Sequence, residues 1–404
     1  MGTNQRRDFI KKSILGISGA ALLPGTVRAT ISSEMQQAEI PELPVRVLGR
    51  TGIKTPLISF GAGSANTAGL VKAAYFAGVK LFFSATYYGE GNNEKLVGEA
   101  LKGLPRESFV VGTAVSPDGI DTRTGKIPIP FDSEAYIKKA SESLSHFGLD
   151  YIDILLFPYA EKRDVLLNES LLKAMQELKK QGMVRHIGLA THSNCDEAIR
   201  AAADSKVYEV VMTAYNYKTE NKEAMNAAIA YASKAGVGIV AMKTTAGVFD
   251  DKNKTRTVNS DAVLKWPLQN ENISSIVSGM SSLDELQKNI KMLKNIRLTD
   301  QELKDLTLAY LENGTGLYCH QCRTCVPQCI NSLEIPTIMR SYMYAYGYRN
   351  LEHARYTLME AGFSGNPCQN CDECNVKCTA GFNVKEKILD ISRLKDVPEE
   401  FLKG

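Results

Sequence analysis

Eight of the nine cysteines in the 404-residue chain lie in two short runs that share one spacing. The runs are CHQCRTCVPQC at 319–329 and CQNCDECNVKC at 368–378, and each reads Cys-x2-Cys-x2-Cys-x3-Cys. Thiolates at this spacing are typical ligands of 4Fe-4S clusters. Structural zinc needs two close pairs of ligands held further apart, and a chain of this length with 44% hydrophobic residues has a core that needs no disulfides. The two runs therefore predict two 4Fe-4S clusters.

The repeated spacing also predicts how the cysteines are shared. In two-cluster ferredoxins the fourth cysteine of each run ligates the cluster of the other run. We therefore expect a ferredoxin-like domain over residues 314–404 with crossed ligation. The first predicted ligand set is Cys319, Cys322, Cys325 and Cys378, and the second is Cys368, Cys371, Cys374 and Cys329. Ile330 and Thr379 stand where such ferredoxins usually have a proline, which is not a ligand.

The N-terminus has the layout of a twin-arginine export signal. Arg6 and Arg7 precede an apolar stretch at 14–24 that is too short to cross a bilayer, and Val27 and Ala29 supply the small residues of a cleavage site. The alternative is a basic tail. Clusters are inserted into reduced thiols in the cytoplasm, so export of the folded, loaded protein explains both ends of the chain.

These features predict a signal peptide at 1–29, a linker at 30–43 and a periplasmic or other extracytoplasmic location, with the twin-arginine translocase as a partner during export. The signal holds five of the 48 basic residues and one of the 45 acidic residues, so 43 and 44 remain after cleavage. Such a neutral chain gives no reason to expect nucleic acid as a partner, and no later stretch is long and apolar enough for a permanent membrane span.

Between residues 44 and 313, eight short β-rich runs alternate with helical patterns. The runs are 56–63, 80–86, 108–115, 151–157, 184–192, 207–215, 237–243 and 273–279. Eight β/α pairs over about 270 residues predict a closed (β/α)8 TIM barrel, an α/β fold. No Gly-x-Gly-x-x-Gly follows the first run, which argues against a dinucleotide-binding open sheet.

One helical pattern is clear enough to predict its ends. Asp132 or Ser133 should cap a helix that ends at Gly148. Its apolar positions at a period of 3.6 predict the buried face. That face consists of Ile137, Ala140, Leu144 and Phe147.

In a TIM barrel, chemistry takes place where the strands end and the following loops begin. This rule selects five positions for attention, which are Tyr88, Pro158, His192, Asn216 and Lys243.

At these strand ends the chain resembles the aldo/keto reductases, and more closely their bacterial branch with a C-terminal ferredoxin-like extension. The similar segments run in order from Arg46 to Asn289 and include FFSATYYGEGNNEKLVGEAL, VRHIGLATHS and IVSGMSSLDELQKN. The two cysteine runs continue the resemblance to the C-terminus. The resemblance implies an oxidoreductase in which a tyrosine donates a proton, a lysine paired with an aspartate tunes it, and a histidine orients the carbonyl.

The chain departs from that catalytic tetrad at three of its four positions. The resemblance implies Tyr88 as the proton donor, but Phe83, Ala114 and Pro158 stand where the family has aspartate, lysine and histidine. A tyrosine with its ordinary pKa of about 10 is a poor proton donor at neutral pH without such a lysine. His192 and Lys243 are the polar residues left at the mouth, so Tyr88, His192 and Lys243 are the catalytic candidates.

The resemblance also implies a nucleotide site at Asn216 and at the turn of Gly279, Ser281 and Ser282, where a helix N-terminus can hold phosphate. The turn lacks the arginine or lysine of many NADPH-preferring relatives. NADPH is not expected outside the cytoplasmic membrane either, so we expect a reaction that does not depend on it.

The sequence leaves three interpretations. The leading one is an exported oxidoreductase with a degenerate tetrad, whose two clusters exchange electrons with a small-molecule substrate and with a periplasmic or membrane-bound redox partner. The second is an NADPH-dependent carbonyl reductase with unusual donors. The third is a non-catalytic electron-relay or scaffold subunit of a larger exported complex.

The export signal gives a first test. Replacing Arg6→Lys together with Arg7→Lys should leave cluster-loaded protein in the cytoplasm, because the translocase reads the arginine pair. Cell fractionation with iron analysis of each fraction measures this. Continued arrival of the loaded protein outside the cytoplasm would refute the assignment.

Overall fold

The computed structural model of the chain describes residues 40–121, 125–247, 259–311, 317–363, 365–369, 371 and 373–402. The predicted export signal and most of the predicted linker lie outside these residues, as does the predicted domain boundary at 313–314. No helix in the described part of the chain is both long enough and apolar enough to cross a membrane.

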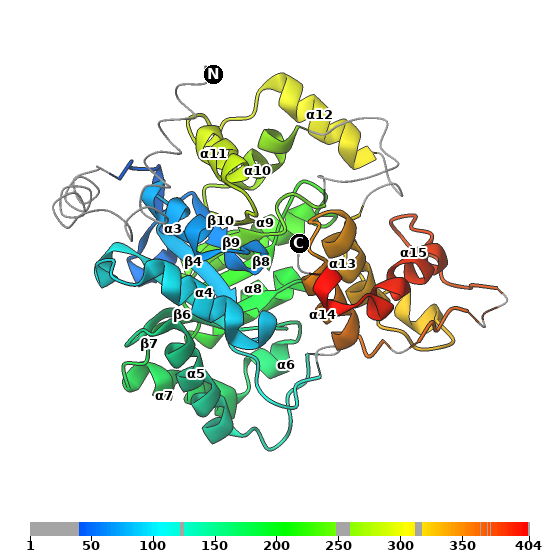
Figure 1. Ribbon diagram of the computed structural model, residues 1–404, viewed down its shortest axis with the longest axis horizontal. Helices are drawn as coiled ribbons and strands as arrows, with labels where there is room; N and C mark the ends of the chain where they lie inside the picture. The colour runs from blue at the N-terminus through cyan, green and yellow to red at the C-terminus, as the bar shows by residue number, and fades with distance from the viewer. Residues whose placement is uncertain are drawn as a thin grey trace.

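Eight parallel strands close into a barrel in the order β10-β3-β4-β5-β6-β7-β8-β9 (Figure 1). The strands are β3 (Ile58–Gly61), β4 (Leu81–Ala85), β5 (Val110–Ala114), β6 (Ile152–Phe157), β7 (Val184–Thr191), β8 (Val210–Ala214), β9 (Gly238–Met242) and β10 (Ile273–Gly279). Each lies within one of the eight runs chosen from the sequence, so the predicted (β/α)8 barrel is confirmed.

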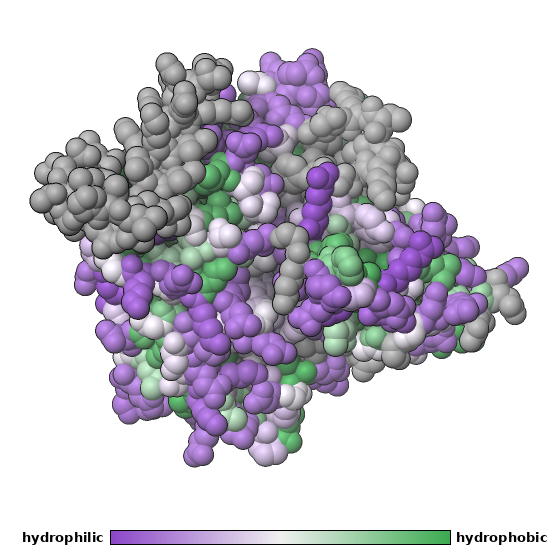
Figure 2. All heavy atoms as spheres, in the orientation of Figure 1, coloured by the Kyte–Doolittle hydropathy of each residue, from purple (hydrophilic) through white to green (hydrophobic). Residues whose placement is uncertain are grey.

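Helices cover the outside of the barrel and bury their apolar faces against the strands (Figure 1). They are α3 (Ala68–Phe76), α4 (Asn92–Leu101), α5 (Ser133–Phe147), α6 (Arg163–Leu166), α7 (Glu169–Lys180), α8 (Cys195–Ser205), α9 (Lys222–Lys234), α10 (Ser260–Leu268), α11 (Leu283–Met292) and α12 (Asp300–Leu311). Polar side chains cover most of the described surface on the face shown in Figure 2.

The sequence did not predict the hairpin that closes the N-terminal end of the barrel. Strands β1 (Val45–Val47) and β2 (Lys54–Pro56) pair antiparallel, and the turn between them inserts the fully buried Leu48 among the interior side chains. Gly49 has a φ of 52°, and a Cβ there would lie 2.3 Å from the backbone nitrogen of Gly238. With this end filled, access to the interior is left to the opposite end, where the strands terminate.

Helix α5 begins and ends where predicted, but its buried face is rotated. The Asp132 side chain accepts a hydrogen bond from the backbone nitrogen of Ala135 at 2.9 Å, and Gly148 ends the helix in a left-handed conformation. The face buries Tyr136 and Ser143 along with Ala140 and Phe147, while Ile137 and Leu144 are only half-buried. A buried hydrogen bond accounts for this rotation, because the hydroxyl of Ser143 donates to the buried carboxylate of Glu94 on α4.

From residue 317 on, the described elements are helices that form a second apolar core, drawn in orange and red in Figure 1. These are α13 (Ile335–Tyr346), α14 (Leu351–Glu360) and α15 (Val384–Ile391), with the cysteine loops before α13 and before α15. The side-chain amide of Asn350, just before α14, donates to the backbone oxygen of Gly63 at 2.9 Å. This bond places α13 and α14 over the C-terminal ends of the strands.

The α5 cap gives a stability test. Asp132→Ala should lower the free energy of unfolding by about 1 kcal/mol, because it leaves the backbone nitrogen of Ala135 without its partner. Ser133→Ala is the matched control and should change it by less than about 0.5 kcal/mol. Denaturant melts measure both. A larger effect at Ser133 than at Asp132 would contradict the observed cap.

Candidate functional site

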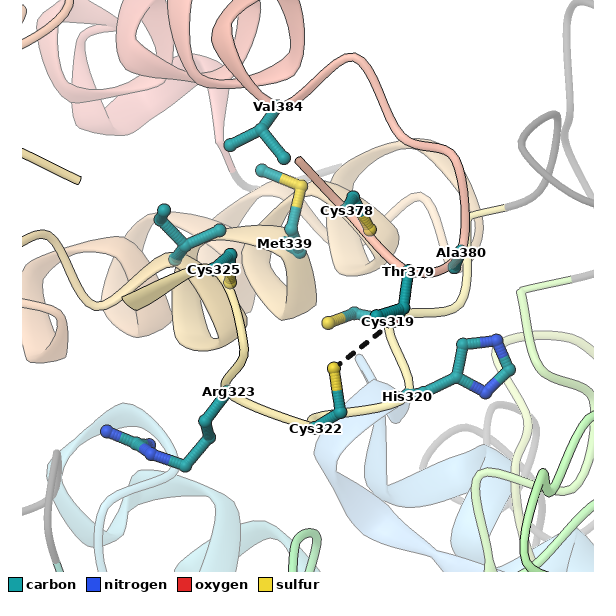
Figure 3. Close-up of a pocket in the computed structure, with 11 residues that line it drawn as sticks. Cys319, His320, Cys322, Arg323, Cys325, Met339, Cys378, Thr379, Ala380 and Val384 are labelled. Carbon is teal, nitrogen blue, oxygen red and sulfur yellow. Dashed lines mark hydrogen bonds between the residues drawn. The ribbon is translucent and has the colours of Figure 1, made fainter. Parts of the chain in front are cut away.

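Four thiols from the two cysteine runs surround one pocket (Figure 3). Cys319, Cys322 and Cys325 come from the loop before α13, and Cys378 comes from the loop before α15. The other lining residues are His320, Arg323, Ile335, Met339, Thr379, Ala380 and Val384. The structure thus brings together the first crossed set, three cysteines of one run with the last cysteine of the other.

The second crossed set is also gathered. Burial raises the pKa of the Cys368 thiol to about 11, and the neighbours that add to this effect are Cys371, Cys329 and Cys374. Cys329 therefore lies with the second run and not with its own. The side-chain amide of Asn331 approaches Cys371 Sγ at 3.4 Å.

The thiols of the first set need a positive partner to ionise. Burial raises the pKa of Cys319 to about 12 and that of Cys325 to about 11, and the other thiols of the set add to both shifts. Four thiolates so close together would repel one another and lose hydration, which a bound cationic centre offsets. The donor set fits iron in this respect.

One thiol of the first set, Cys322, has a lowered pKa because hydroxyl groups lie beside it. Although burial raises the pKa of Cys322, hydrogen bonds from Thr324 and Thr379 outweigh it and lower the pKa. The Thr379 hydroxyl lies 3.3 Å from Cys322 Sγ, the contact drawn as a dashed line in Figure 3. Thr379 stands where ferredoxins usually have proline, so the departure supplies a hydrogen bond to a predicted ligand, Cys322.

The four thiols of the first set line the walls of one pocket. Among the residues that the structure describes, no group of three or more His, Cys, Asp or Glu side chains is placed to hold a single metal ion.

The lost tetrad positions form an apolar layer at the top of the barrel interior. Phe83 and Ala114 are each 4% exposed, and Pro158 is buried. The Phe83 ring covers Gly112 so closely that a Cβ there would lie 2.4 Å from it. Burial, then Tyr344 and Glu360, raise the pKa of Tyr88 above its usual range despite the opposing effect of Arg340. Tyr88 is therefore a neutral phenol and a poor acid.

Helices α13 and α14 cover the barrel mouth with their own polar side chains. Lys243 Nζ, which follows β9, donates to the hydroxyl of Tyr344 on α13 at 2.6 Å. The hydroxyl of Tyr159 donates to the Glu360 carboxylate on α14. The ring of His353, also on α14, stands edge-on to Tyr88 with centroids 5.0 Å apart.

A small cavity remains between the barrel and the C-terminal helices. Its lining residues are His192, Ala214, Lys243, Tyr318, Cys319, Gln321, Arg340 and Met343. Its volume of about 10 Å³ is room for about one water molecule. Cys319 belongs to the first thiol set, so a predicted cluster ligand shares this cavity with His192 and Lys243, two of the three catalytic candidates. Tyr88, the third candidate, does not line it.

Burial sets the protonation of both candidates in the cavity. Burial lowers the pKa of Lys243 to about 8, with Arg340 adding to the effect and Tyr348 opposing it. Burial, then Lys243 and Arg340, lower the pKa of His192 well below its usual range, so its ring is neutral. Its Nε2 atom is covered and has no hydrogen-bond partner among the described residues.

The predicted nucleotide-binding residues are engaged in other bonds. Asn216 is fully buried, donates to the backbone oxygen of Lys243 at 3.1 Å and accepts from the backbone nitrogen of Lys218 at 2.9 Å. It holds the backbone of Lys243, which has a φ of 57°. Asn216 therefore has a structural role in this arrangement.

In the turn after β10, the carboxylate of Glu285 occupies the place where the sequence predicted a phosphate of the nucleotide. Glu285 Oε2 accepts from the backbone nitrogen of Ser281 at 2.7 Å and from its hydroxyl at 3.0 Å. The Ser282 hydroxyl caps α11 by accepting from the backbone nitrogen of Glu285 at 3.2 Å. Gly279 is packed so that a Cβ would lie 2.8 Å from Ser64 Oγ. The carboxylate takes the donors that a phosphate would need and repels its charge.

Sequence reasoning missed the polar residues that the C-terminal helices bring to the mouth. They are Arg340, Tyr344, His353 and Glu360. A signal was present, because Arg340 and Tyr344 are four residues apart and so share a face of α13. Four tyrosines occupy every second position from 342 to 348. Tyr342 and Tyr346 pack together, with ring centroids 4.5 Å apart, while Tyr344 bonds to Lys243 and Tyr348 bonds to Thr245.

Comparisons with known proteins agree with the barrel. The model of the aldo/keto reductase family matches residues 62–262. The chain is 26% identical to L-galactose dehydrogenase of Arabidopsis thaliana, over 67% of this chain and 95% of that one. It is also 26% identical to D-threo-aldose 1-dehydrogenase of a Pseudomonas species, over 47% and 66%. These relatives are oxidoreductases, which supports the prediction of an enzyme.

Solved structures share the fold. An aldo-keto reductase from Bacillus halodurans, in its holo form, superposes with a TM-score of 0.55 at 20% identity, over 66% of this chain and 96% of that one. An aldo-keto reductase from Klebsiella pneumoniae in complex with NADPH gives a TM-score of 0.52 at 20% identity, over 67% and 95%. At this identity the likeness shows the fold alone.

The crossed thiol sets give a test by double substitution. Cys319→Ser with Cys378→Ser removes two ligands of one set, so the protein should keep about four iron atoms per chain. Cys319→Ser with Cys329→Ser removes one ligand from each set and should lose both clusters. Cys195→Ser, outside both sets, should keep about eight.

Iron and sulfide analysis of anaerobically purified protein measures all three variants. The opposite order for the two double variants would mean that each run holds its own cluster. Stoichiometric zinc in the unmodified protein would exclude the clusters.

Proposed function

Since the comparisons support an aldo/keto reductase barrel, we propose that this protein is an exported iron-sulfur oxidoreductase with a degenerate catalytic tetrad. The observation that carries the proposal is the cavity at the barrel mouth. Cys319, a predicted cluster ligand, lines it together with His192 and Lys243. Two 4Fe-4S clusters, when bound, would supply or accept single electrons at this place. Export and a periplasmic or membrane-bound redox partner complete the proposal and rest on the N-terminal sequence.

The residues of the chain suit proton handling in the cavity. Lys243, with its pKa of about 8, is mainly an ammonium at neutral pH yet gives up its proton more readily than an exposed lysine. It donates to Tyr344, whose pKa burial raises to about 12, so Tyr344 remains a phenol. Lys243 is therefore the proposed proton donor to a small-molecule substrate, and Tyr344 positions it.

Three observations favour electron supply by clusters over NADPH. Tyr88 is a neutral phenol, with Ala114 standing where the family has its lysine, and Glu285 takes the donors of the turn after β10. Helices α13 and α14 lie over the mouth, and the cavity that remains has room for about one water molecule.

Two alternatives stand on particular observations. The dehydrogenase relatives favour an NADPH-dependent carbonyl reductase with unusual donors. The small volume of the cavity favours a non-catalytic relay or scaffold subunit. The test below separates all three.

Turnover with two electron sources tests the proposal. Anaerobically purified protein should contain about eight iron atoms per chain. Reduced methyl viologen should drive conversion of small carbonyl compounds, followed by reoxidation of the clusters, while NADPH should not. Steady NADPH oxidation by a carbonyl substrate would instead establish the reductase. Inactivity with both sources, with co-purification of a partner protein, would establish the scaffold.

A matched pair of lysine variants tests the role of Lys243. Lys243→Met should lower the viologen-driven rate by about a hundred- to ten-thousandfold, the usual contribution of a general acid, with iron content unchanged. Lys234→Met removes an exposed lysine at the end of α9 and should leave the rate as it was. An unchanged rate in Lys243→Met would exclude the proposed proton donor.

A further inference from the structure

Two basic side chains and a histidine face the cavity at the barrel mouth. Lys243 and His192 come from strand ends of the barrel, and Arg340 comes from α13. No aspartate or glutamate of the described chain lines this cavity. Lys243 and Arg340 bring two positive charges to this space and no carboxylate of the described chain lines it, which favours an anionic occupant.

Arg340 keeps its charge in this position. Burial works against the guanidinium, but Tyr344 and Glu360 outweigh it and raise the pKa of Arg340. Glu360 is engaged with the hydroxyl of Tyr159 and is not among the residues that line the cavity. The planar fork of an arginine matches the two oxygens of a carboxylate better than any other side chain does.

The other two side chains have donors left for a ligand. Lys243 uses one of its three ammonium hydrogens on Tyr344. The covered Nε2 atom of His192 has no partner within the described chain, and such an atom in a native protein calls for an explanation. In the tautomer with the proton on Nε2, neutral His192 would donate a hydrogen bond to a ligand in the cavity.

We propose that this cavity binds the carboxylate of a small-molecule ligand through Arg340, Lys243 and His192. This inference rests on the proposed function, because it narrows the substrate class to small carbonyl compounds that also carry a carboxylate. The room of about one water molecule suits one carboxylate oxygen. The rest of the ligand would then extend beyond this small space.

The test compares acetate with acetamide, which has nearly the same shape and no charge, on the cluster-loaded protein at constant ionic strength. Acetate should raise the midpoint of thermal unfolding in a saturable way, because a ligand that binds the folded state stabilises it. Acetamide should not. Equal effects of the two compounds would overturn the proposal.

Substitutions of Arg340 test whether acetate binds in this cavity. Arg340→Gln should weaken acetate binding about 10- to 100-fold, the usual loss for a charge-assisted hydrogen bond. Arg340→Lys, which keeps the charge but not the fork, should lose less and carries the test if Arg340→Gln does not fold. Lys234→Gln removes an exposed charge and should bind as the unmodified protein does. Full acetate binding in a folded Arg340 variant would also overturn the proposal.

The binding test needs no electron donor, so the two proposals fail separately. Loss of acetate specificity with viologen-driven turnover intact would leave the oxidoreductase standing with an uncharged substrate. Arg340-dependent acetate binding in a protein that turns over NADPH would keep the carboxylate site and remove the proposed electron path.

Discussion

The hydrogen bond of 2.6 Å between Lys243 Nζ and the Tyr344 hydroxyl fastens the C-terminal helices to the barrel mouth, and the chemistry of the mouth depends on the burial that comes with it. Burial is the largest cause of the lowered pKa of Lys243, of the neutral ring of His192 and of the raised pKa of Tyr88. The C-terminal end of the barrel, which could otherwise admit a solvated substrate, is covered by helices α13 and α14 of the same chain.

The covering of the barrel mouth by α13 and α14 is physically consistent with the apolar residues that replace the catalytic tetrad. An aspartate–lysine pair under α13 and α14 would have to be stripped of water, and such pairs gain little once desolvation is counted. Phe83 and Ala114 fill the same space with apolar atoms and pack with Ala85 and Met242. The positive charge at the mouth is carried instead by Lys243 and by Arg340, a residue from outside the barrel.

Features that follow from regular spacing could be predicted from the sequence, whereas contacts between distant segments of the chain could not. The eight strands and both thiol groupings follow from period and repeat. The β1–β2 hairpin has strands of three residues, too short to show a period. The hydrogen bond to the buried Glu94 changes which face of α5 is buried. The hydrogen bond from Ser281 to Glu285 depends on side-chain geometry. The approach of Arg340 to Lys243 needs a fold that joins residues about a hundred positions apart. Cofactors, export and partners remain predictions.

The crossing of the thiol sets has a consequence for biosynthesis. Neither set is complete within its own run, because Cys378 closes the first and Cys329 belongs to the second. A chain still emerging from the ribosome with residues up to 367 exposed would offer three thiols of one set and a single thiol of the other. If the two sets hold clusters as proposed, loading would have to wait until the last cysteines have been made, and each cluster would then tie the last segment of the chain to the one before it.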